Sequence, residues 1–171
     1  MKKIFPLLLC AILLLCACSQ PQQTDDVLDL FFSVRYQGKT ENMTRLAPQE
    51  FWDWSASQGR SVEDVIAYAQ GAYNGWLGQF GSDLHVSYTV LREEALDDAL
   101  LQDIAQALHK QYDIDTDAIT AGRKLTVKLT VKGSQLQDTT QNDYILITVH
   151  GTEYVVMVDD ENGSFTVTFR M

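Results

Sequence analysis

Cysteine is missing from most of the chain. The 171 residues include three cysteines, Cys10, Cys16 and Cys18, and all three lie within the first eighteen positions. Disulfides, thiolate nucleophiles and cysteine-ligated metals are therefore excluded from the rest of the chain. A segment of about 150 residues can bury enough apolar surface to fold as one domain without such crosslinks.

Long hydrophobic runs are also scarce. The apolar stretch Ile4–Leu15 is too short for a membrane-spanning helix, which needs roughly 20 apolar residues. It follows the basic pair Lys2 and Lys3 and is followed by the small residue Ala17. This arrangement is typical of a secretory signal peptide, and we expect residues 1–17 to be removed.

The residues around the expected cleavage point, Leu15-Cys16-Ala17-Cys18, resemble the lipobox of bacterial lipoproteins. The resemblance implies that Cys18 becomes the mature N-terminus and carries a thioether-linked diacylglycerol. Two acyl chains anchor a protein far more firmly than one, so the protein would stay on the extracytoplasmic face of the cell membrane. The alternative is an ordinary cleaved signal that leaves a free cysteine, which is a liability in a secreted protein.

Positive charge is scarce. Lys and Arg number 13 against 23 Asp and Glu, a formal net charge of −10. Loss of the leader would remove Lys2 and Lys3, leaving 11 basic side chains and a net charge of −12. Nucleic-acid binding and peripheral binding to anionic lipid both need clusters of Lys and Arg. The sequence therefore predicts no nucleic-acid partner, and contact with the membrane through the lipid anchor alone.

Motifs for catalysis, metals and cofactors are absent. His85, His109 and His150 are scattered, and none has a second histidine or a carboxylate at ligand spacing, whereas zinc needs three or four converging donors. The sequence contains no G-x-S-x-G elbow, phosphate loop or dinucleotide fingerprint. We expect no catalytic residue, no metal and no cofactor.

Two acidic clusters resemble calcium loops only superficially. Asp113, Asp115 and Asp117 alternate as in an EF-hand, but the Gly and Glu required at the sixth and twelfth positions are missing. We interpret this cluster as a solvated turn that caps the preceding helix. Asp159–Gly163 could bind calcium weakly but is more simply a hairpin turn.

The order of secondary structure follows from hydrophobic periodicity. Residues 18–24 form a polar tether, and residues 25–171 form one domain. Helical spacing predicts helices over 25–37, 40–47, 62–80 and 97–112, with a short turn after Pro48. Alternation predicts strands over 84–91, 124–132, 144–149, 154–158 and 165–169, with a polar loop over 133–142 and a tight turn at 150–151.

The helix predicted over 62–80 carries an unusual set of glycines. Gly71, Gly75 and Gly78 lie on roughly one face, although each costs about 1 kcal/mol relative to alanine. Either another element packs very close to this face, or the last turns of the helix unravel.

These elements predict an α+β fold in which N-terminal helices pack on one face of a curved antiparallel β-sheet. The pattern resembles the NTF2-like (cystatin-like) superfamily, and in particular small lipoproteins of Gram-positive bacteria without an assigned function. The resemblance rests on five features of the sequence. They are the opening helix with Val27–Phe32, the glycine that ends it (Gly38), the Leu-Ala-Pro step at Leu46–Pro48, the approach to a strand over Tyr112–Gly122, and the closing hairpin about Gly151.

The resemblance implies a cavity between the helices and the sheet. Aromatic residues crowd into the helical half, and they either line an apolar cone or fill the core. The candidate ligand-binding residues are Trp52, Trp54, Tyr73, Trp76 and Tyr88.

Enzymes of this superfamily place an Asp or His in the cavity, facing the substrate. The inward strand positions of this sequence are apolar or aromatic, which argues against proton-transfer chemistry. They are Val86, Tyr88, Leu125, Val127, Leu129, Val156, Phe165 and Val167.

Three functions remain open from the sequence. The first is a non-catalytic, lipid-anchored domain that binds an envelope protein, a peptide or cell-wall material. The second is capture of a small apolar ligand in the cavity. The third, least supported, is an NTF2-like enzyme.

Overall fold

The computed structural model of the protein describes residues 25–161 and 164–171. The signal peptide predicted for residues 1–17, the lipidation site Cys18 and the tether over 18–24 lie outside the described residues. Part of the turn predicted at Asp159–Gly163 also lies outside them. Among the described helices, none is long and apolar enough to cross a membrane.

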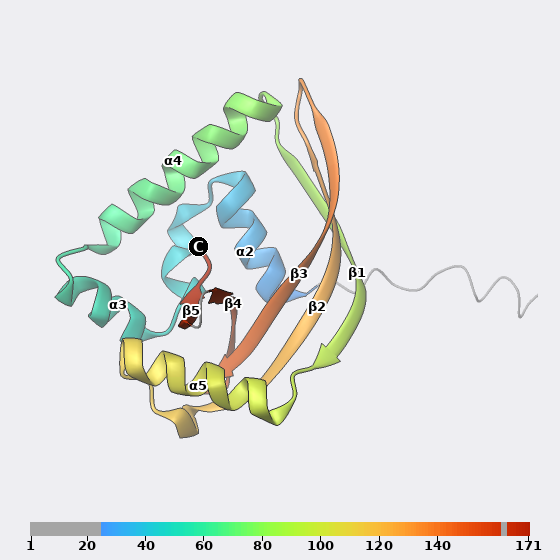
Figure 1. Ribbon diagram of the computed structural model, residues 1–171. Coiled ribbons are helices and arrows are strands. Elements are labelled where there is room, and N and C mark those ends of the chain that lie inside the picture. The colour runs from blue at the N-terminus through green and yellow to red at the C-terminus, as the bar shows by residue number, and fades with distance from the viewer. Residues whose placement is uncertain (1–24, 162–163) are drawn as a thin grey trace, which may run out of the picture.

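Helices at the N-terminus cover one face of a curved, five-stranded antiparallel sheet with strand order β1-β2-β3-β4-β5 (Figure 1). This arrangement confirms the predicted α+β fold. The elements are α2 (Asp26–Gln37), η2 (Thr40–Leu46), α3 (Gln49–Ser57), α4 (Val62–Phe80), β1 (His85–Ala95), α5 (Asp98–Tyr112), η3 (Thr116–Ala118), β2 (Ile119–Lys132), β3 (Gln137–Val149), β4 (Thr152–Glu161) and β5 (Ser164–Phe169).

The ends of α2 follow from the local sequence. The Asp25 side chain accepts hydrogen bonds from the backbone N–H groups of Val27 and Leu28, which have no partner within the helix. Gly38 ends the helix with φ of 67°, a left-handed conformation that favours glycine. Phe31 and Phe32 are buried on this helix and pack edge-on against Tyr144 of β3.

Helix α4 runs unbroken to Phe80, so its last turns do not unravel. No neighbouring atom lies within 4 Å of the Cβ position that a side chain would occupy at Gly71, Gly75 or Gly78. Neither explanation offered for the glycine face therefore applies within the described chain. The start of α4 is a capping box, in which Ser61 and Asp64 exchange hydrogen bonds.

The loop predicted over 133–142 is much shorter than expected, because β3 already begins at Gln137 and pairs there with Lys132. The first seven residues of β3, 137–143, are all exposed, so they show no apolar alternation to mark a strand. The turn is held instead by the end of α4, where the Gln135 N–H donates to the carbonyl of Phe80 at 2.8 Å.

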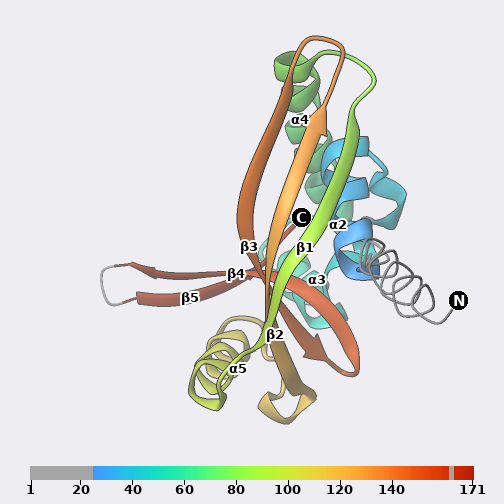
Figure 2. The same cartoon turned by 90° about the vertical axis from the view of Figure 1, so that its right-hand side faces the viewer.

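Strand β4 pairs with β3 only over its first half, Thr152–Val156. The predicted tight turn places His150 and Gly151 at φ of 50° and 78°, and β4 then pairs with β3 over Ile145–Val149. From Val156 onward β4 pairs with β5, and this hairpin projects away from the β2–β3 hairpin (Figure 2). A corner forms where the two hairpins diverge, beside Tyr144.

Candidate functional site: a polar pocket beside the diverging hairpins

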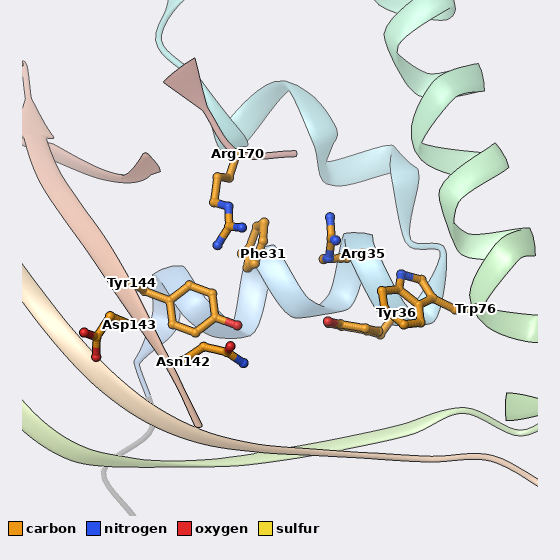
Figure 3. Close-up of a pocket in the computed structure, with 8 residues that line it drawn as sticks. All are labelled: Phe31, Arg35, Tyr36, Trp76, Asn142, Asp143, Tyr144 and Arg170. Atoms are coloured by element: carbon orange, nitrogen blue, oxygen red, sulfur yellow. The ribbon is translucent and has the colours of Figure 1, made fainter. Parts of the chain in front are cut away.

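A pocket of about 260 Å³ lies at this corner, between α2, α4, β3 and the C-terminal residues (Figure 3). Its lining combines aromatic rings with cationic and amide side chains. The lining residues are Phe31, Arg35, Tyr36, Trp76, Asn142, Asp143, Tyr144 and Arg170.

Local geometry explains why these side chains meet. Phe31 and Arg35 stand one helical turn apart on α2, so they share a face of that helix. Asn142 and Tyr144 alternate on β3 and therefore point to the same side of the sheet. Arg170 follows β5, and its backbone N–H donates to the carbonyl of Val155 at 2.9 Å, which fixes the residue beside β4.

Both arginines of the pocket lie over aromatic rings. The Arg35 guanidinium carbon is 5.8 Å from the ring centre of Tyr36 and 5.7 Å from that of Trp76. The Arg170 guanidinium carbon is 5.6 Å from the ring centre of Tyr144. Such contacts attract the cation to the ring face and orient the planar guanidinium group.

Among the described residues, neither guanidinium has an ion pair or a hydrogen bond. Asp143 is the acidic residue of the pocket lining, but its carboxylate points away from the pocket (Figure 3). That carboxylate lies 2.7 Å from Lys124 Nζ and accepts a hydrogen bond from Thr126 at 2.7 Å, on the opposite face of the sheet. The positive charge of Arg35 and Arg170 is therefore not neutralised within the pocket.

Two tyrosine hydroxyls add hydrogen-bonding capacity. The hydroxyls of Tyr36 and Tyr144 point toward one another beside the two arginines (Figure 3). Burial raises the pKa of Tyr144 and Tyr36 adds to this effect, whereas Arg170, Arg35 and the Asn142 side chain oppose it. The Tyr144 hydroxyl is therefore neutral near pH 7 and keeps its proton to donate.

A second polar cluster, around Arg123, is already paired. Arg123 forms ion pairs with Asp25 at 2.7 Å, Glu153 at 2.6 Å and Glu93 at 3.3 Å. Its donors are satisfied by carboxylates of the same chain. We therefore assign the cluster a structural role.

The histidines lie apart. The Nδ1 atom of His109 is 3.0 Å from the carbonyl oxygen of Ile114, and Nε2 of His150 is 2.6 Å from a carboxylate oxygen of Glu50. Within residues 25–161 and 164–171, no group of three His, Cys, Asp or Glu side chains could hold a metal ion.

The acidic residues 113–117 form turns in the structure. Asp113 ends α5 in the left-handed conformation, and the Asp115 side chain caps η3 by accepting from the Asp117 N–H.

Of the five aromatic residues proposed from the sequence, one lines this pocket and the other four make separate contacts among the described residues. Trp76 lines the pocket, while Tyr73 packs against Gly38. Trp52 is buried and donates its indole N–H to the carbonyls of Thr44 and Ala47.

The remaining two aromatic candidates serve other contacts. Trp54 packs edge-on against Tyr112, with ring centres 5.0 Å apart. Tyr88 packs on Phe32, and its hydroxyl exchanges two hydrogen bonds with the backbone of Asp25.

Sequence reasoning missed the two arginines of the pocket. Arg35 carried a usable signal, because it lies one turn after Phe31 on a helix with a broad apolar stripe in a chain poor in cations. Arg170 carried no signal, since only the fold brings the C-terminus to α2.

No protein-family model, curated protein or solved structure matches the chain. The resemblance to NTF2-like lipoproteins therefore stays a prediction.

Proposed function

We propose that this chain is a lipid-anchored, non-catalytic binding protein on the extracytoplasmic face of the cell membrane. The observation that carries the proposal is the pocket with two oriented guanidinium groups, Arg35 and Arg170, which have no ion pair within residues 25–161 and 164–171. In this proposal Cys18 holds the domain at the membrane, and the pocket receives the ligand or part of a partner.

The pocket side chains favour binding over chemistry. Arginine, asparagine and neutral tyrosine side chains donate hydrogen bonds and hold charge, but they are poor general acids and bases near pH 7. The inward positions of β2 are filled by Leu125, Val127 and Leu129, which are buried. An apolar ligand would leave the two guanidinium groups unpaired in the complex, so the charges favour a polar one.

The anchor is tested by replacing Cys18 with alanine in the full chain, in its bacterial host. We expect wild-type protein in the membrane fraction with a diacylglyceryl group on its first mature residue, and Cys18→Ala protein without the lipid and released to the medium. Cys10→Ala is the matched control, because that residue would be removed with the leader. Retention of unlipidated Cys18→Ala at the membrane would contradict the anchor.

The binding role is tested on full-length protein purified in detergent and incubated with an envelope extract of the host. Native mass spectrometry should show a retained small molecule or partner whose mass does not change with time. Release of a chemically altered product would instead indicate an enzyme. Retention of nothing would contradict a binding role.

A further inference from the structure

We propose that the pocket binds a small oxyanion, a carboxylate or a phosphate or sulfate group, between Arg35 and Arg170. This inference rests on the proposed function, because it names the chemical class of ligand for the same pocket. It follows from the charge, the hydrogen-bonding groups and the size of the site.

The charge of the site is the first argument. The protein is strongly acidic overall, yet two cations from distant parts of the sequence line one pocket, whose acidic residue turns its carboxylate to the other face of the sheet. At ordinary salt concentrations, exposed carboxylates more than about 10 Å from the pocket are largely screened, so they repel a bound anion only weakly. Charged contacts inside a pocket are screened much less. An anion is therefore the ligand that this pocket favours.

The orientation of the donors is the second argument. The ring faces of Tyr36, Trp76 and Tyr144 hold the guanidinium groups, so the donors at the edges of those planes remain available. Such a planar fork matches the two oxygens of a carboxylate or phosphate. The Tyr36 and Tyr144 hydroxyls, which point toward one another, add hydroxyl donors to the pocket (Figure 3).

The size of the pocket is the third argument. Its volume of about 260 Å³ falls just below the roughly 300–1,000 Å³ typical of pockets for drug-sized molecules. The anionic group therefore belongs to a small molecule, or to a short segment of a larger one that reaches the corner.

The test is isothermal titration of the full-length protein in detergent with sulfate, inorganic phosphate and succinate, at constant ionic strength set with sodium chloride. Neutral succinamide is the uncharged control. We expect saturable one-to-one binding of at least one anion and none of succinamide. Preference for phosphate or sulfate would identify a phosphate- or sulfate-bearing ligand, and preference for succinate a carboxylate.

Variants assign the binding to the pocket. Arg35→Gln and Arg170→Gln should each weaken binding roughly tenfold or more, because each removes a charged hydrogen-bond donor. Arg45→Gln removes the same charge from an exposed position outside the pocket and should leave affinity unchanged. Arg35→Lys, which keeps the charge but loses the fork, should restore part of the affinity. Circular dichroism verifies that each variant is folded.

Two results would overturn the inference. One is the absence of saturable binding by any of the three anions. The other is equal weakening by Arg45→Gln and Arg35→Gln, which would indicate only a general charge effect. If no anion binds but the wild-type protein still retains a neutral molecule from the envelope extract, the inference fails and the proposed binding function stands.

Discussion

Arg123 donates from Nε and Nη2 to the two carboxylate oxygens of Glu153, at 2.8 and 2.6 Å. The same guanidinium group reaches Asp25, which caps the first turn of α2. Hydrogen bonding to Glu153 is the largest of the causes that raise the pKa of Arg123 above its ordinary value. One arginine therefore joins β2 and β4 to the start of the described domain.

Replacing Arg123 with methionine should lower the free energy of unfolding by roughly 1–3 kcal/mol, because the well-buried Asp25 carboxylate loses its ion-pair partner. Urea denaturation measures the change. Arg92→Met is the matched control, since Arg92 pairs with Glu94 on the surface with 68 % of its side chain exposed, and should cost less than about 1 kcal/mol. Equal effects of the two substitutions would contradict a structural role for Arg123.

Tyr88→Phe should destabilise the protein by about 1 kcal/mol. The Tyr88 hydroxyl accepts from the Asp25 N–H at 2.7 Å and donates to the Asp25 carbonyl at 3.0 Å, so its loss leaves partly buried backbone groups without these bonds. The control is Tyr68→Phe, at a position that is 79 % exposed. Thermal unfolding of both variants should separate them, and unchanged stability of Tyr88→Phe would show that these bonds contribute nothing.

Two glycine substitutions should act in opposite directions. Gly75→Ala should raise the free energy of unfolding by up to about 1 kcal/mol, because alanine favours the helix and the added methyl group meets no neighbour. Gly38→Ala should lower it, because φ is 67° there and the new Cβ would lie 2.9 Å from ring atoms of Tyr73. Urea denaturation measures both. Destabilisation by Gly75→Ala would indicate that the α4 face is packed against something in solution.

Alkaline pH should destabilise the fold through its buried tyrosines. Burial raises the pKa of Tyr112 to about 12, above the value near 10 of an unfolded chain. The folded state therefore holds the proton more tightly, and the stability gained from this is complete below about pH 10 and lost as the pH rises through about 12.

Replacing Tyr112 with phenylalanine tests this pH dependence. Urea denaturation at several pH values should give a shallower loss of stability for Tyr112→Phe than for the wild type. The stability of Tyr112→Phe should still fall somewhat with rising pH, because burial also raises the pKa of Tyr144 and Tyr154. If the free energy of unfolding fell equally with pH in both proteins, Tyr112 would not be a source of the alkaline destabilisation.

Local signals predicted most of the fold. The end of the first helix at Gly38 and the His150–Gly151 turn depend on residues close in sequence, and the structure confirms both. The start of β3 was missed because its polar residues are held by backbone pairing to β2, with water on both sides. No side-chain pattern marks such a strand.

The pocket could not be predicted from sequence for a different reason. Arg35 and Arg170 lie near opposite ends of the domain's sequence. They line one pocket only because β4 diverges from β3 beside Tyr144. Aromatic residues such as Trp52 and Trp54 were the more visible candidates, but the structure places them against Phe51 and Tyr112. Composition identifies aromatic residues, whereas only the tertiary fold distinguishes core rings from pocket rings.

The most direct test of an anion site is a nuclear magnetic resonance titration that follows the Nε–H signals of the arginine side chains. On addition of sulfate or succinate at constant ionic strength, the signals of Arg35 and Arg170 should move together and saturate at the same anion concentration, while that of Arg45 stays in place. Equal, non-saturating shifts of all arginine signals, or no shift at Arg35 and Arg170, would contradict the account.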